Sequence, residues 1–144
     1  MQTVRLTDLE LVRHDESRGV AFPFHAGTGT AASAAVYFEL APGVAVGSHT
    51  DSAEELLFIV EGKAEATIGD ERGLVEAGDV ALVPTNVPHD VRNIGEGPLR
   101  VFGFFAGSAV VHVFEEAPSA DAPRVFVTGG PVPIAAFDAE PSLA

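Results

Sequence analysis

Apolar residues along this chain fall into short runs that are separated by glycine, proline and acidic residues. Several short strands with turn residues about 8–12 positions apart are typical of an all-β sandwich or barrel. No stretch repeats apolar residues at the 3.6-residue period of a long helix. The pattern therefore predicts one all-β domain without long helices. The expected strands are residues 34–40, 55–61, 64–68, 73–76, 80–83, 99–105 and 110–114.

The C-terminal part of the chain differs from the rest. Residues 115–123 are acidic and proline-rich, which is typical of the end of a compact unit. The segment after them keeps apolar side chains, among them Val125, Phe126, Ile134 and Phe137. We therefore expect a barrel with N-terminal strands over residues 1–117. A C-terminal extension, 118–144, would pack on the barrel or on a partner subunit, and a frayed terminus is the alternative.

One predicted strand carries information about partners. Residues 56–60, Leu-Leu-Phe-Ile-Val, are apolar on both alternating faces, whereas a half-exposed strand alternates apolar and polar side chains. One face meets the interior of the barrel, so the other face needs a cover. A homodimer provides that cover, and a covering N-terminal segment would serve equally.

Composition limits the classes of protein. The 144 residues are 47% hydrophobic and 20% charged, which suits a single folded domain and argues against disorder. The absence of cysteine excludes disulfides, thiolate metal sites and thiol nucleophiles. A formal net charge of −13 disfavours nucleic acid and anionic membrane surfaces as partners. We find neither a signal peptide nor an apolar run long enough to span a bilayer, so we expect a cytoplasmic protein.

Two segments gather residues that bind metal ions. In the first, His49 and Asp51 are two positions apart and therefore point to the same side of a strand, and Glu55 opens the next apolar run. In the second, His89 follows two prolines that restrict the backbone. Imidazole and carboxylate ligands suit one divalent transition metal ion: Fe, Mn, Co, Ni or Zn. Two neutral imidazoles with two carboxylates would also cancel a 2+ charge, which lowers the cost of burying the ion.

The spacing of these residues resembles the two motifs of the cupin superfamily, G-x5-H-x-H-x3,4-E-x6-G and G-x5-P-x-G-x2-H-x3-N. The matching positions are Gly43, His49, Glu55 and Gly62 in the first motif and Gly78, Pro84, His89 and Asn93 in the second. Asp51 stands where the family's second histidine usually lies, and Asn86 replaces a glycine. Since asparagine tolerates a positive φ better than most residues, Asn86 is expected to keep the turn.

The resemblance implies a double-stranded β-helix, or jelly-roll, barrel with a single metal ion inside one end. Its ligands would be His49, Asp51, Glu55 and His89. Asp51 either ligates the ion through oxygen or leaves a three-ligand site and lies just outside it. Glu54 competes with Glu55, which we prefer because six residues separate it from Gly62, as the motif requires.

The remaining polar residues have less specific settings. His25 lies before a glycine-rich loop and is a candidate acid–base group, as is Glu55. His14 and His112 are expected to be hydrogen-bonded structural residues, and Asp90 a solvated charge.

An apolar pocket beside the metal ion is expected to bind a small organic molecule, since a phosphorylated sugar would need more basic residues. The expected lining residues are Val36, Phe38, Leu57, Ile59, Val80, Leu82, Phe102 and Phe104. The leading hypothesis is a metal-dependent enzyme, an O2-dependent oxygenase or dioxygenase of the Fe(II) or Mn(II) type. A non-oxidative isomerase, cyclase or lyase is one alternative, and a metal-stabilised binding protein without activity is another.

The same residues permit a second oxygenase hypothesis. His49, Asp51 and His89 resemble the H-x-D…H triad of Fe(II)/2-oxoglutarate oxygenases, in which Arg100 would pair with the co-substrate carboxylate. The short spacing between the histidines and the presence of the second cupin motif disfavour this hypothesis. In the cupin interpretation, Arg100 is a surface charge.

Overall fold

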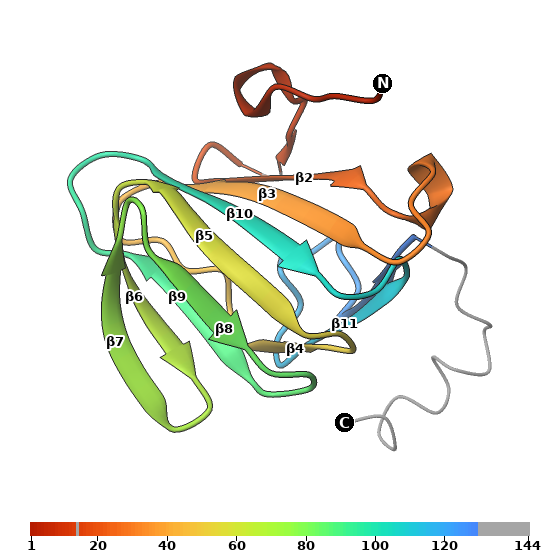
Figure 1. The fold of residues 1–144 in the computed structure, drawn as a ribbon. Helices are drawn as coiled ribbons and strands as arrows, with labels where there is room; N and C mark the ends of the chain where they lie inside the picture. The colour runs from red at the N-terminus through yellow and green to blue at the C-terminus, as the bar shows by residue number, and fades with distance from the viewer. Residues whose placement is uncertain (14, 130–144) are drawn as a thin grey trace.

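The computed structural model of the chain describes residues 1–13 and 15–129. Over these residues, two six-stranded antiparallel sheets face each other and form a barrel (Figure 1). Sheet A has the order β1 (Val12–Arg13), β2 (Arg18–Phe24), β3 (Ala34–Leu40), β10 (Leu99–Phe105), β5 (Glu55–Glu61), β8 (Val80–Val83). Sheet B has the order β12 (Val125–Thr128), β11 (Val110–Phe114), β4 (His49–Asp51), β9 (His89–Asn93), β6 (Lys63–Ile68), β7 (Glu71–Glu76).

After β3, the chain passes back and forth between the two sheets. β4 lies in sheet B, β5 in sheet A, β6 and β7 in sheet B, β8 in sheet A, β9 in sheet B and β10 in sheet A. Strands that are distant in sequence therefore become neighbours, as β3 and β10 do in sheet A and β4 and β11 do in sheet B. This arrangement confirms the expected all-β, jelly-roll fold.

Helices contribute little to the described residues. Two short 3-10 helices, η1 (Leu6–Asp8) and η2 (Ala26–Thr28), precede β1 and β3. No helix in this part of the chain has the length and apolar character needed to cross a bilayer.

The pattern of apolar runs located most of the strands. β3, β5, β8, β10 and β11 have the expected bounds, and β6 and β7 begin slightly earlier than expected. The pattern did not mark β2, which contains a glycine and a proline, or β9, whose sequence His-Asp-Val-Arg-Asn is mostly polar. These two strands are therefore held by tertiary pairing rather than by apolar periodicity.

Side-chain alternation on β5 sorts its apolar residues between two environments. Leu57 and Ile59 point into the barrel and pack in its core, whereas Leu56 and Phe58 point outward and are about two-fifths exposed. The core at this end of the barrel consists of Leu40, Leu57, Ile59, Ala64, Val83, Val91, Leu99 and Val101.

The pairing register corrects part of the expected pocket. Val80 and Leu82 of β8 pair with Phe58 and Leu56, so their side chains share the outer face of sheet A. Phe102 and Phe104 of β10 lie on the same face. The expectation that these four residues line the pocket is wrong, because strand pairing, which the sequence does not specify, decides which face is inside.

The described part of the C-terminal segment includes a strand of sheet B. β12 pairs with β11 in antiparallel register, so residues 125–128 lie beside the barrel rather than apart from it. Ile134 and Phe137, which prompted the expected packing of the extension, lie outside the described residues.

Two asparagines of the second motif hold turns. Asn86 has a φ of 59°, the left-handed conformation expected of it. Asn93 is fully buried, and its Nδ2 donates hydrogen bonds to the carbonyls of Leu40 and Gly97. Its Oδ1 accepts a hydrogen bond from the Gly95 N–H. Asn93 therefore ties the β9 end to the turn that follows it and to β3.

Replacing Asn93 with alanine is expected to lower the free energy of unfolding by about 3 kcal/mol, because buried carbonyls and an N–H lose their partners. Chemical denaturation measures this change. Asn86→Gly is the matched control and should shift the free energy of unfolding by less than about 1 kcal/mol, since glycine accepts a positive φ. Equal stability of Asn93→Ala and the parent chain would contradict the assignment.

Candidate metal centre

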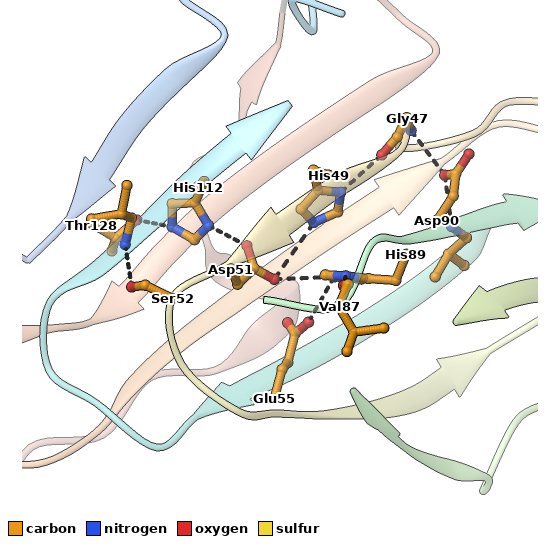
Figure 2. Close-up of polar contacts among 12 residues, drawn as sticks. Gly47, His49, Asp51, Ser52, Glu55, Val87, His89, Asp90, His112 and Thr128 are labelled. Atoms are coloured by element: carbon orange, nitrogen blue, oxygen red, sulfur yellow. Dashed lines mark hydrogen bonds and ion pairs between the residues drawn. The ribbon is translucent and has the colours of Figure 1, made fainter. Parts of the chain in front are cut away.

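Two histidines from neighbouring strands of sheet B meet inside one end of the barrel. His49 on β4 is the direct cross-strand partner of His89 on β9. Their ring centroids are 4.1 Å apart, and Figure 2 shows both rings directed toward the same point. The two cupin motifs, 40 positions apart along the chain, are thus joined at their histidines.

An extra residue before β4 turns His49 toward the interior. Ala45 pairs with Arg92, and His49 pairs with His89. Four steps along one strand therefore oppose three along the other, which is a β-bulge. Without the extra residue, side-chain alternation would place His49 on the outer face of the sheet.

Backbone groups fix the orientation of both rings. The Nδ1–H of His49 donates to the Gly47 carbonyl at 2.8 Å, and that of His89 donates to the Val87 carbonyl at 2.9 Å. Each Nε2 is left to face the centre of the site, which is the arrangement that metal-binding histidines usually adopt. The Asp90 carboxylate accepts a hydrogen bond from the Gly47 N–H at 2.9 Å (Figure 2). Asp90, expected to be solvated, instead holds the bulge beside His49.

Two buried carboxylates face the imidazoles. Asp51 lies on the same face of β4 as His49, and its Oδ2 is 3.0 Å from Nε2 of His89 and 3.7 Å from Nε2 of His49. Glu55 reaches the same point from sheet A, with Oε1 3.4 Å from Nε2 of His89. Glu54, its competitor in sequence, is exposed. The structure thus brings together all four residues that the motifs single out.

A further histidine lies against these residues. His112 on β11 is the cross-strand partner of Asp51. Its Nδ1–H donates to Asp51 Oδ1 at 2.7 Å, and its Nε2 accepts from the Thr128 hydroxyl at 2.8 Å. The hydrogen bonds expected of His112 are present, but one of them reaches a proposed ligand. Alternation along β11 marks His112 as inward-facing, whereas only the register of β4 with β11 identifies Asp51 as its partner.

Burial and charge shift the pKa values of the site in opposite directions. Burial lowers the pKa of His49 to about 4 and raises the pKa of Glu55. Burial alone would raise the pKa of Asp51, but the hydrogen bond from His112 and the close contact with His89 outweigh it and hold that pKa well below its usual range. Burial alone would lower the pKa of His89, but the carboxylates of Asp51 and Glu55 raise it to about 10. The two carboxylates therefore favour a positive charge at Nε2 of His89, which a proton supplies in the metal-free site.

The donor atoms fit a metal ion. Within the described residues, Asp51 Oδ2 and His89 Nε2 are buried and lie 3.0 Å apart, but neither makes a well-aligned hydrogen bond. Donor atoms of His49, Asp51 and His89 all lie within 4.8 Å of one another. A cation among these atoms would satisfy both groups, and the carboxylates would oppose its charge. Imidazole nitrogens with carboxylate oxygens suit a divalent transition metal.

A cavity of about 560 Å³ lies beside the centre. Its lining includes His49, Asp51, Glu55, His89 and His112, and the rest is mostly apolar. Val36, Phe38 and Leu57 line it as expected, whereas Ile59 packs in the core instead. The volume falls within the range of small-molecule sites.

Two residues proposed for chemistry lie elsewhere. His25 caps η2, where its Nδ1 accepts a hydrogen bond from the Gly27 N–H, and it does not line the cavity. Arg100 donates to the Tyr37 hydroxyl and lies 3.6 Å from the Glu39 carboxylate on the outer side of sheet A. Arg100 is therefore not placed to bind a co-substrate carboxylate in the cavity.

Comparisons of the sequence with known proteins point to one family. A family model described as Cupin domain matches residues 36–105. The uncharacterized protein MJ1618 of Methanocaldococcus jannaschii is 36% identical over 50 residues, which are 35% of this chain and 40% of that protein.

Solved structures share the fold. Oxalate decarboxylase from Bacillus subtilis, described with Mn(II) centres, has a TM-score of 0.70 at 24% identity and is matched over 77% of this chain and 31% of its own. The formate complex of Lactobacillus farciminis oxalate decarboxylase has a TM-score of 0.69 at 22% identity, over 76% of this chain and 34% of its own. This chain thus spans about a third of the length of these enzymes.

Gly103 on β10 leaves room for the Glu55 carboxylate. A Cβ atom at this position would collide with Glu55 Oε2 and with Val36. Gly103→Ala is therefore expected to displace the carboxylate and to weaken the binding of Mn(II) or Zn(II) by about tenfold or more, as loss of a group around a metal site does. Isothermal titration calorimetry measures the affinity. Gly73→Ala on β7 is the control, because nothing lies within 4 Å of its added Cβ. Unchanged affinity in Gly103→Ala would argue against Glu55 as a ligand.

Proposed function

This chain belongs to the cupin superfamily, and from that premise we propose that it is a metal-dependent enzyme that acts on a small organic molecule. His49, Asp51, Glu55 and His89 hold one divalent transition metal ion, Fe, Mn, Ni, Co or Zn. Their two negative charges balance the charge of the ion, so the centre is neutral when loaded.

One observation carries this proposal. Asp51 Oδ2 and His89 Nε2 are buried, make no well-aligned hydrogen bond within the described residues and line a cavity of about 560 Å³. Buried polar atoms without partners are costly, and they persist where a ligand or an ion satisfies them. A cavity of this size beside the centre is typical of a small-molecule site, whereas a purely structural metal site does not require one.

The proposed reaction depends on O2. When bound, Fe(II) or Mn(II) supplies a redox-active Lewis acid in the cavity. Phe22, Phe38 and Phe105 line the same cavity and make its wall apolar. An apolar lining admits O2, which is itself apolar, together with an organic substrate. His112 holds Asp51 in place, so that one carboxylate oxygen is fixed and the other faces the centre.

A non-oxidative lyase is the second candidate. The structural neighbours described as oxalate decarboxylases favour it, since decarboxylation cleaves a carbon–carbon bond. Oxalate itself suits the cavity poorly, because a small dianion gains nothing from mostly apolar walls. We therefore propose a larger and more apolar substrate than oxalate for either reaction.

Metal content tests the proposal directly. Mass spectrometry of the purified chain is expected to find about one transition metal ion per chain. His89→Ala is expected to bind Mn(II) or Zn(II) at least about tenfold more weakly, because the loss of even a group that supports a ligand weakens metal binding by about that factor. His25→Ala is the matched control and should keep the metal, since His25 lies outside the cavity.

Nitric oxide then tests the O2-dependent reaction against the non-oxidative alternatives. In the Fe(II)-loaded chain, an electron paramagnetic resonance signal of an iron–nitrosyl adduct would show an open coordination position, which O2-dependent chemistry requires. A metal that takes up no nitric oxide would favour the non-oxidative reaction or a binding protein. Failure of the chain to bind any of the five metals would overturn the proposal.

A second copy of the chain is the proposed cover of the outer face of sheet A. That face exposes Leu56, Phe58, Val80, Leu82 and Phe104, each by 40% or more. Val4 and Leu6 of the N-terminal segment line a small pocket with Phe58 and Phe102, yet the five residues stay exposed in the presence of that segment. β8 is also the edge strand of the sheet. A two-fold axis would place the same apolar patch on itself and protect that edge.

Leu82→Glu is expected to convert a dimer into a monomer, because a carboxylate would be buried in the apolar interface. Sedimentation velocity measures the mass. Leu74→Glu on β7 is the control, since Leu74 is 74% exposed and lies in sheet B. A parent chain that sediments as a monomer at micromolar concentration would contradict the proposed dimer.

A further inference from the structure

Arg18 places a positive charge on the inner face of the barrel. It is the first residue of β2 and pairs with Leu40 of β3, so the two side chains point to the same side of sheet A. Val20 pairs with Phe38 two residues further along, and all four residues line the cavity beside the metal centre. Among the described residues that line the cavity, Arg18 is the only lysine or arginine.

Two backbone carbonyls hold the guanidinium in place. Nη2–H donates to the Pro118 carbonyl at 2.6 Å, and Nη1–H donates to the Val46 carbonyl at 3.4 Å. These contacts connect β2 with the segment before β4 and with the segment after β11. They use two of the five N–H donors, so the group is oriented and still has donors to offer.

No carboxylate lies within ion-pair distance of Arg18 in the described part of the chain, and the exposed Asp15 carboxylate interacts with its charge only weakly, from a greater distance. Four other arginines lie within ion-pair distance of an acidic side chain: Arg5, Arg13, Arg72 and Arg100. Arg92, like Arg18, donates to a backbone carbonyl instead. Arg18, which is partly buried, makes no such pair. Glu10 also lines the cavity, but it is exposed and forms no ion pair with Arg18. Arg18 therefore combines a place in the cavity lining with the absence of an acidic group within ion-pair distance, in a chain of formal charge −13.

Arg18 and the metal centre lie toward different ends of the cavity. The Glu55 carboxylate lies over Gly103, which pairs with Val36 of β3. The metal centre is therefore level with Val36 along that strand. Arg18 lies at the level of Leu40, four residues further along that strand. Four residues of a strand span about 13 Å. A ligand between the two would need an apolar body of the length of a short acyl chain or an aromatic ring with a side arm.

We propose that the cavity binds an apolar monocarboxylate, with the carboxylate on the free donors of Arg18 and the other end of the molecule toward the metal centre. This inference rests on the proposed function in taking the cavity as the substrate site. A guanidinium pairs with a carboxylate through two parallel hydrogen bonds. One arginine balances one carboxylate, whereas a phosphate dianion would need a second cation that the lining residues do not include.

Binding of matched acids and amides tests the inference. The probes are hexanoate, benzoate and phenylacetate with hexanamide, benzamide and phenylacetamide, measured by NMR titration of the metal-loaded chain. At least one acid is expected to bind ten- to a hundredfold more tightly than its amide, as a charge-assisted hydrogen-bond pair implies. In Arg18→Met the ratio should fall to about one. In Arg18→Lys, which keeps the charge and loses the fork, part of the ratio should remain.

Arg72→Met is the matched control, because it removes the same charge from an exposed position on β7 and should keep the full ratio. Thermal unfolding of each variant shows whether it is folded. If Arg18→Met does not fold, the ratio measured in Arg18→Lys decides the result. Equal binding of acids and amides by the parent chain, or a ratio that survives in Arg18→Met, would overturn the inference.

His89→Ala separates this inference from the proposed function. If the acid preference persists in His89→Ala and disappears in Arg18→Met, Arg18 binds the carboxylate, whether or not the chain is a metal enzyme. If the preference is lost in His89→Ala and kept in Arg18→Met, the metal ion binds the carboxylate. That second result would overturn the role of Arg18 and leave the metal-dependent function standing.

Discussion

The candidate metal centre depends on one extra backbone residue between Ala45 and His49. A β-strand has a side-chain period of two, so an insertion of one residue moves every following side chain to the opposite face. The bulge thereby brings His49, and with it Asp51, into the interior of the barrel. Asp90 stabilises the bulge by accepting a hydrogen bond from Gly47, where the regular ladder is interrupted. The chemistry of the site thus follows from a local irregularity of sheet B rather than from its regular pairing.

Asp51 connects that irregularity with the rest of sheet B. One carboxylate oxygen accepts a hydrogen bond from His112 on β11, and the other faces His89 on β9. A carboxylate that is bound on one side cannot rotate freely, so its second oxygen has a fixed position. Asp51 stands where the cupin motif usually has its second histidine, and a histidine on the neighbouring strand, His112, contacts it. The imidazole of His112 and the carboxylate of Asp51 are therefore adjacent, although His112 lies on β11 and Asp51 on β4.

The sequence predicted the fold and the four residues around the centre, because apolar runs and motif spacing are local properties. It did not predict the roles of His112, Asp90 or Arg18, since each depends on a strand register or on a backbone carbonyl far away in the chain. The same limit explains why Val80 and Leu82 were assigned to the wrong face. A strand with apolar residues on both faces does not indicate which face is inside.

The residues around the centre come from both sheets, with Glu55 on sheet A and His49, Asp51 and His89 on sheet B. An ion bound by all four would cross-link the sheets and add its binding free energy to that of the folded chain. Resistance to unfolding and to proteases would then rise and fall with the free metal concentration around the protein. The amount of folded protein in a cell would then follow the concentration of available metal, whether or not the chain is an enzyme.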